Sequence, residues 1–469
     1  MSDLRIERDS LGEVGVPADA LWGAQTARAV ANFPISGRPM PGPFIAAMGL
    51  IKAAAAAVNR QAGRLDDSLA DAVIRAAREV ADGRLDEQFV VDVFQTGSGT
   101  STNMNANEVI ANRATLFLGG ELAADAAGAP RVHPNDHVNM GQSSNDVIPT
   151  ALHVSVAAGI AGRLTPALEA LRAALADKAA ELDAVVKIGR THLMDAVPIR
   201  LGQEFAGYAG QVADATGVLD SARERLYELP LGGTAVGTGL NAPAGFAAAV
   251  CERLADETSL PFRETGNHFA AAGARDAALV ASAALRSAGL AMGKIASDIR
   301  LLGSGPRCGL GELLLPAVQP GSSIMPGKVN PVLCESVIQV ACQVVGNDAA
   351  VAAGAAGGVG SILELNVAMP MMAANLLDSI GLLTGAAVAL TDKCIRGLAA
   401  NEERCRELIE QSLAMVTVLA PRLGYDAAAE IAKEAHRTGR TIREVCLEKA
   451  VLPEAELNDL LDARKQTGP

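Results

Sequence analysis

Long apolar segments separated by short polar ones dominate this chain. Apolar residues recur three and four positions apart in a segment that begins at Thr165-Pro166 and in four more segments, 201–227, 272–302, 332–356 and 371–398. This spacing predicts helices, and a Thr-Pro pair is typical of a helix cap and first turn. Because the segments are apolar on all sides, we expect a long-helix bundle that packs against further copies of itself.

The ends of the chain carry shorter and more polar patterns. Helical spacing also predicts helices at Ile45–Asn59, Asp67–Asp82 and Asn103–Phe117, and charged residues become frequent after about residue 397. We therefore expect an all-α fold with three domains. These are a mostly helical N-terminal domain (1–140), a central long-helix bundle (141–396) and a small helical C-terminal domain (397–469).

Composition supports helices and limits the possible partners. The chain has 469 residues, of which 49% are hydrophobic but only 3% aromatic. Small, straight-chain residues favour closely packed helices over sheets, and this length exceeds one compact core. The net charge of -13 argues against nucleic acid as a partner. An anionic substrate would therefore need a locally positive pocket.

The cysteines and the apolar runs indicate the cellular compartment of the protein. The seven cysteines are scattered without a CxxC pair, which favours reduced thiols and argues against a zinc site. The segment Met1–Glu7 lacks the apolar core of a signal peptide. Polar residues such as Asn347-Asp348 and Asp378 interrupt the apolar runs, so we expect no membrane span and a cytoplasmic protein.

Four polar loops contrast with this apolar background. They are Gly97–Thr100, Gln142–Asp146, Gly189–His192 and Gly321–Pro331. Each precedes or interrupts a helical run, so each could direct backbone N–H groups and hydroxyls at an anion. In the last loop, Pro331 suits a first helical position with Asn330 as its N-cap, and Lys328 lies beside that N-terminus. Taken singly, such sequences are more often caps or surface loops than sites.

Together the loops resemble class II, iron-independent fumarases of the fumarase/aspartase superfamily along nearly the whole chain. Further similar stretches are Leu21–Thr26, Ile188–Leu193, Leu231–Asn241 and Gly424–Lys433. Aspartases typically have the sequences GAGT, QSTND and RTQ where this chain has GSGT, QSSND and RTH. They also typically have an alanine at the position that Gly327 occupies here. The resemblance therefore favours fumarase over the alternatives, which are aspartate ammonia-lyase or another superfamily lyase. A non-catalytic scaffold, such as the related lens proteins, would not need intact His192, Ser322, Lys328 and Glu335.

The resemblance implies a hydro-lyase of the tricarboxylic acid cycle that reversibly and stereospecifically hydrates fumarate to L-malate through an aci-carboxylate intermediate. It implies no metal and no cofactor, and a homotetramer whose sites are each built from three chains. It assigns catalysis to His192, Ser322, Glu335 and Lys328. It assigns substrate binding to Ser98, Gly99, Thr100, Ser143, Ser144, Asn145, Thr191, Ser323, Lys328, Val329 and Asn330.

The resemblance also implies a second anion site at His133, Pro134, Asn135 and Asp136, although a plain turn would explain the same stretch. Three places depart from the family pattern. They are Ala270 after Asn267-His268-Phe269, the run Gly360–Leu363, and Pro130 where many members carry arginine. None lies in the catalytic loops, so they leave room for an altered substrate preference or weaker binding at the second site.

Overall fold

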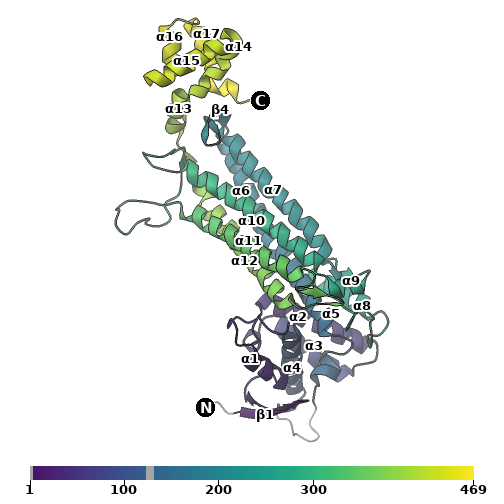
Figure 1. Cartoon of the computed structure of the whole chain (residues 1–469). Helices are drawn as coiled ribbons and strands as arrows, with labels where there is room; N and C mark the ends of the chain where they lie inside the picture. Colours follow the sequence, from purple (N-terminus) through teal and green to yellow (C-terminus); the bar gives the residue numbers. More distant parts are fainter. Residues whose placement is uncertain (1–3, 123–130, 469) are drawn as a thin grey trace. The chain divides into compact units, whose positions relative to one another are not determined.

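The computed structural model describes residues 4–122 and 131–468 (Figure 1). Pro130, one of the departures from the family pattern, lies outside the described residues. The chain folds into two compact units. Unit 1 contains the described residues of Met1–Thr165, Gly217–Ser287 and Cys342–Leu383, and unit 2 contains those of Pro166–Thr216, Ala288–Ala341 and Thr384–Pro469.

Unit 1 consists mainly of helices, with short strands at its loops. Its strands are β1 Leu4–Asp9, β2 Gly12–Pro17, β5 Glu228–Leu229, β6 Arg263–Glu264, β8 Ser361–Ile362 and β9 Leu365–Asn366. Its helices are α1 Ala24–Asn32, α2 Gly42–Gln61, α3 Asp67–Ala81, α4 Thr100–Phe117, α5 Ser144–Gly159, α8 Phe246–Thr258 and α9 His268–Gly273. Single helical turns are η1 Asp86–Gln88, η2 Pro134–Val138 and η3 Ile160–Leu164.

Unit 2 combines helices with one long hairpin and one two-residue strand pair. Its strands are β3 Val186–Thr191, β4 Met194–Arg200, β7 Leu313–Leu314 and β10 Ala399–Ala400. Its helices are α6 Thr165–Glu181, α13 Glu402–Gln411, α14 Ala420–Leu423, α15 Tyr425–Thr438, α16 Ile442–Glu448 and α17 Glu454–Leu460. Shorter helical turns are η4 Ile395–Gly397, η5 Leu413–Leu419 and η6 Ala463–Gln466.

Four long helices contribute residues to both units. They are α7 Leu201–Leu226, α10 Asp276–Leu302, α11 Val332–Ala355 and α12 Met369–Lys393. The hydrophobic pattern predicts them within a few residues, so the expected all-α fold of long helices is confirmed. The largest difference is at the end of α12, which was expected at 398 and lies at Lys393. The start of α10 was expected at 272 and lies at Asp276. Asn267 caps the separate helix α9, and Ala274 then adopts an extended conformation that breaks the helical run.

Small residues allow the helices to approach closely. A Cβ added at Gly49 on α2 would lie 2.5 Å from the backbone nitrogen of Ala81, at the end of α3. A Cβ at Gly293 on α10 would lie 3.0 Å from the Cβ of Ala341 on α11. No larger side chain fits at Gly49, because the obstacle is backbone. Close helix packing of this kind explains why so few aromatic residues are needed in the core.

The hairpin β3–β4 was not expected from the sequence. We predicted a polar loop at Gly189–His192, but Gly189, Arg190 and Thr191 lie on β3, which pairs with β4 in antiparallel register. A run such as VKIGRT alternates too little to be separated from a loop by pattern alone. The hairpin β1–β2 at the N-terminus was missed as well, although Leu4–Glu7 alternates apolar and polar residues.

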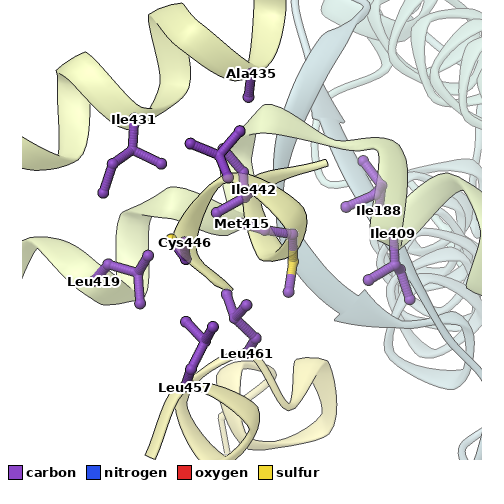
Figure 2. Close-up of a cluster of buried hydrophobic side chains, with 11 residues drawn as sticks. Ile188, Ile409, Met415, Leu419, Ile431, Ala435, Ile442, Cys446, Leu457 and Leu461 are labelled. Atoms are coloured by element: carbon purple, nitrogen blue, oxygen red, sulfur yellow. The ribbon is translucent and has the colours of Figure 1, made fainter. Parts of the chain in front are cut away.

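The C-terminal segment builds its own core within unit 2. Figure 2 shows Ile431, Ile442, Leu457 and Leu461 from the C-terminal helices and turns pointing toward one another, with Ile188 of β3 also in the cluster. All of these side chains are buried. Burying a side chain of this size contributes about 1.5–3 kcal/mol. The cluster therefore anchors the base of the β3–β4 hairpin to the C-terminal helices.

Several helices are more apolar than the sequence pattern led us to expect. By length and mean hydropathy alone, five of the described helical stretches could cross a membrane, whereas we expected none. Two of these stretches, Gly42–Gln61 and Ser144–Glu181, are 78% and 72% buried within the chain itself. The other three, in α10, α11 and α12, are only 39–50% buried. These three helices therefore leave apolar surface uncovered in the single chain.

Candidate functional site

Two polar loops meet in unit 1 through a chain of hydroxyl groups. The Ser98 Oγ lies 2.9 Å from the Thr100 Oγ1, which lies 2.8 Å from the Ser144 Oγ. Thr100 begins α4 and Ser144 begins α5, so two helix N-termini point to the same place. Helix N-termini carry partial positive charge and free N–H groups. The arrangement therefore has the groups that an anion requires.

Gly99 is required where these helices start. Its φ of 76° is left-handed, and an added Cβ would lie 2.8 Å from the side chain of Ile148 on α5. Both facts exclude larger residues at this position without a shift of the surroundings. The glycine thus lets the start of α4 approach α5 closely enough for the hydroxyl contact.

Asp146 holds the second loop in place. It forms a capping box with Ser143, and its carboxylate also accepts hydrogen bonds of 3.0 Å from the backbone N–H groups of Gly232 and Thr234. Asn145 donates from its side chain to the Ala235 carbonyl at 2.8 Å. The segment Leu231–Asn241, one of the family-like stretches, is thereby fixed against Ser143–Asn145. The pattern Ser-x-x-Asp is a capping signal and could have identified Asp146.

Lys52 contacts the same loop, and the sequence did not reveal its role. Its Nζ is completely buried and donates to the Asn139 Oδ1 and the Gln142 Oε1, both at 2.9 Å. Burial lowers the pKa of Lys52 to about 7, and Asp146 partly opposes the shift. A single lysine inside the alanine-rich run of α2 is the signal that could have revealed it.

The predicted histidine lies at the tip of the β3–β4 hairpin in unit 2. His192 and Leu193 form its two-residue turn, with φ of 57° and 62°. Positive φ at both positions is the geometry of a type I′ turn, which matches the twist of a hairpin. Leucine rarely adopts this conformation, which costs about 1–3 kcal/mol. His192 and Thr191 are solvent-exposed in the single chain.

Ion pairs between buried side chains hold the β3–β4 hairpin in place. The Arg190 Nη1 donates to the Glu312 Oε2 at 2.8 Å, and the Lys187 Nζ lies 3.5 Å from the same oxygen. Lys187 also pairs with Glu204 on α7 at 3.3 Å. Burial raises the pKa of Glu204, and Lys187 counteracts this rise. Glu312 and Lys187 are almost completely buried, so the pairs fix the strand that leads to His192.

The loop Gly321–Pro331 closes on itself. The Gly321 N–H donates to the Lys328 carbonyl at 2.8 Å, and the Asn330 side-chain amide donates to the Gly321 carbonyl at 2.6 Å. Helix α11 begins at Val332, and the Pro331 carbonyl accepts the first helical hydrogen bond from Glu335. The expectation that Asn330 caps this helix is therefore wrong by one residue, because its side chain closes the loop instead.

The Ser322 hydroxyl is held by the backbone of its own loop. Its Oγ accepts hydrogen bonds from the backbone N–H groups of Ile324 at 3.2 Å and Met325 at 3.0 Å. Two N–H donors aimed at one oxygen stabilise negative charge on it. The arrangement orients the Ser322 hydroxyl through a local turn.

Residues of the β3–β4 hairpin and of the loop Gly321–Pro331 line the same cavity of about 900 Å³ in unit 2. Its lining includes Leu193 from the hairpin tip and Lys328, Val329 and Asn330 from the loop. Ser323, Lys328 and Val329 are exposed, and Glu335 is half-buried on the first turn of α11. Among the described residues, the structure records no hydrogen bond between the His192 side chain and this loop or Glu335.

The stretch predicted to form a second anion site lies in unit 1. His133, Pro134 and Asn135 line a cavity of about 320 Å³ together with Arg131, but Asp136 is not part of its lining. The His133 Nδ1 instead accepts a hydrogen bond from the Asp136 N–H at 3.1 Å. The carboxylates of Glu7, Asp9 and Glu108 also lie at this cavity.

Glu108 connects this cavity to another family-like stretch. It accepts hydrogen bonds of 2.6–3.1 Å from the N–H groups of Gly23, Gln25 and Thr26 and from the Thr26 hydroxyl. Burial raises the pKa of Glu108, and these hydrogen bonds counteract the rise. Within residues 4–122 and 131–468, no group of three or more His, Cys, Asp or Glu side chains has the arrangement of a metal site.

Comparison with known proteins gives the family. A lyase family matches residues 12–346, and a family described as the fumarase C C-terminus matches residues 415–468. The chain is 54% identical to a class II fumarate hydratase of Halobacterium salinarum, covering 99% of this chain and 97% of that protein. The chain belongs to the class II fumarase family.

Other relatives agree with this membership. A class II fumarate hydratase of Thermosynechococcus vestitus is 52% identical over 97% of this chain and 96% of its own length. The crystal structure of a class II fumarase from Schistosoma mansoni matches with a TM-score of 0.95 and 40% identity, covering both chains completely. Family membership thus extends over the whole length, including both units.

Proposed function

We propose that this protein is a class II fumarate hydratase, which reversibly adds water to fumarate to give L-malate. The observation that carries the proposal is the 54% identity to a class II fumarate hydratase over 99% of the chain. The polar loops add a physical reason. They supply hydroxyls, helix N-termini and a lysine, which are the groups that bind a dicarboxylate.

Substrate binding falls to two sets of donors. In unit 1, Ser98, Thr100, Ser144 and Asn145 offer donors at the starts of α4 and α5 to one carboxylate. In unit 2, Lys328 and Asn330 are the donors for the other carboxylate. This division follows from the chemistry of the groups, since each set contains donors and no carboxylate of its own.

The proton at carbon is the difficult part of the reaction. In the dehydration direction, Ser322 removes the proton from the carbon next to one carboxylate. The electron pair left behind delocalises into that carboxylate as an aci-carboxylate, and Lys328 offsets the added negative charge. A free serine is a poor base. The two N–H donors on the Ser322 Oγ address this difficulty, because they favour its deprotonated form.

Proton transfer at the other carbon falls to His192. Protonated His192 gives a proton to a bound water molecule as that water gives one to the leaving hydroxyl, so that water departs and the double bond forms. Glu335 is the partner that orients or recharges this histidine. Hydration of fumarate reverses the same steps, and no net proton or electron is gained or lost.

The assembly proposed with this function is a homotetramer with sites shared between subunits. The half-exposed apolar surfaces of α10, α11 and α12 supply the driving force. The exposure of His192 and Lys328 in the single chain favours completion of the site by other copies. We also propose a cytoplasmic location, and three domains at 1–140, 141–396 and 397–469.

One assay tests the function. Purified protein is mixed with fumarate, or with L-malate, and the ultraviolet absorbance of the fumarate double bond is followed. We expect fumarate to disappear without ammonia and to appear from malate. Turnover only of aspartate, or of fumarate only with ammonia, would instead establish an aspartate ammonia-lyase. No turnover of either would support a scaffold protein.

A further inference from the structure

A second polar cavity in unit 1 lies apart from the polar loops described above. It has a volume of about 660 Å³ and is lined by the end of α7, by β6, and by the segment from α9 into the start of α10. Ser98, Thr100, Ser144 and Asn145 are not among its lining residues, and neither is any residue of the second predicted anion site. The feature that distinguishes this cavity is Arg275.

Arg275 is a buried cation with unused hydrogen-bond donors. Its side chain is 2% exposed, and its Nη2 donates to the carbonyls of Ala271 and, at 3.0 Å, Ala272. Its Nε and Nη1 are buried without a hydrogen-bond partner. A buried charge is normally paired, because leaving it unpaired is strongly destabilising.

The guanidinium remains charged despite this environment. Burial lowers the pKa of Arg275 to about 10, which still leaves it protonated at neutral pH. Among the described residues, Arg275 forms no ion pair, although the exposed Asp276 follows it in the chain. An anion is therefore the missing partner of this side chain.

The other acidic residues of the cavity are already engaged. Arg263 pairs with Glu224 at 3.2 Å and with Glu228 at 3.4 Å. His153 uses its Nδ1 on the Glu228 carbonyl at 2.8 Å. Burial and the neighbouring Arg275 lower the pKa of His153 to about 4, so the imidazole is neutral and adds no competing charge.

We infer that this cavity binds a small oxyanion, with a carboxylate, sulfate or phosphate group whose oxygens accept hydrogen bonds from the Nε and Nη1 of Arg275. Arg225, Thr265 and Asn267 also line the cavity and supply further donors. The volume of the cavity exceeds that of a single small anion, so the remaining space can hold water or the rest of a larger acid.

Isothermal titration calorimetry of the full-length protein with inorganic sulfate, at constant ionic strength, tests this inference. We compare the wild-type chain with Arg275→Met, with the conservative Arg275→Lys, and with Arg406→Met, which removes one exposed arginine elsewhere. The expected result is a sulfate-binding event, in addition to any at the polar loops, in the wild type and in Arg406→Met. Its affinity should fall at least tenfold in Arg275→Met and less in Arg275→Lys. Equal sulfate binding by all four proteins would overturn the inference.

A crystal of the wild-type protein grown with selenate gives the location. An anomalous peak within hydrogen-bonding distance of the Arg275 guanidinium supports the site, and the peak should be absent from Arg275→Lys or much weaker there. The crystal could instead show a carboxylate of a neighbouring subunit bound to Arg275 and no selenate there. Another copy of this chain would then be the partner of Arg275, and the small-anion site would be overturned. If Arg275→Met fails to fold, the comparison of Arg275→Lys with the wild type still decides the outcome.

Discussion

The hydroxyl oxygens of Thr100 and Ser144 lie 2.8 Å apart, although 44 positions separate them in the sequence. Each stands in the first turn of its own helix, α4 or α5. The contact therefore joins two helix N-termini, from two of the four polar loops, into one surface.

The double variant Thr100→Val/Ser144→Ala should bind substrate weakly. Each hydrogen bond to a carboxylate contributes about 1.5–3 kcal/mol, so losing two should raise KM by at least ~100-fold. Steady-state kinetics with fumarate and malate measure this change. The control is Thr96→Val/Ser101→Ala, which removes a neighbouring exposed hydroxyl pair of the same kind. Equal effects of both double variants would remove Thr100 and Ser144 from the binding surface.

His192→Asn should reduce turnover about 100- to 10,000-fold, the usual contribution of an acid–base group. Asparagine tolerates positive φ, so the turn at the hairpin tip should survive the substitution. Circular dichroism and the unfolding midpoint should match the wild type, because His192 is exposed. His436→Asn, at another exposed position, is the control. A loss of less than fivefold would exclude His192 from the chemistry.

Lys328→Met should reduce kcat more than it raises KM. This split follows if the lysine chiefly stabilises the extra charge of the aci-carboxylate, which exists only near the transition state. The variant should also lose affinity for an inhibitor that carries this extra charge, which competition assays measure. A higher KM with unchanged kcat would make Lys328 a binding residue only.

Lys52 should make stability depend on pH. Its pKa in the folded protein is about 7, below the ordinary value of 10.5. Between these two pH values the unfolded chain binds a proton that the folded chain does not bind. The free energy of unfolding of the wild type, relative to Lys52→Met, should therefore rise as the pH increases from 7 to 10. Below pH 7 the cost of the buried charge is fully present. Lys393→Met, at an exposed position, should show no such trend.

The sequence predicts the long helices well because their apolar residues recur at helical spacing over twenty or more positions. It fails at the β3–β4 hairpin, where Ile188 is buried against C-terminal residues such as Ile409 and Met415 that are more than 200 positions away (Figure 2). A strand stabilised by such distant contacts leaves no clear local pattern.

The family motifs identify the polar loops, but not what holds them. Asp146, Lys52 and Glu312 act through hydrogen bonds to residues that the sequence does not place nearby, such as Gly232, Asn139 and Arg190. Their roles depend on burial, which a single sequence does not reveal for a charged residue. Arg275 was missed for the same reason.

Shared active sites predict complementation between two defective chains. One parent carries Thr100→Val/Ser144→Ala in unit 1, and the other carries Lys328→Met in unit 2. If each site takes these groups from different chains, a mixture unfolded and refolded together should contain about a quarter of sites with both sets intact, since each set is drawn independently from the two parents. Activity should then rise to a comparable fraction of the wild-type value, far above either parent. If both groups came from one chain, every site would keep one defect. Mixed tetramers seen by mass spectrometry without a gain in activity would therefore refute the sharing of these two groups.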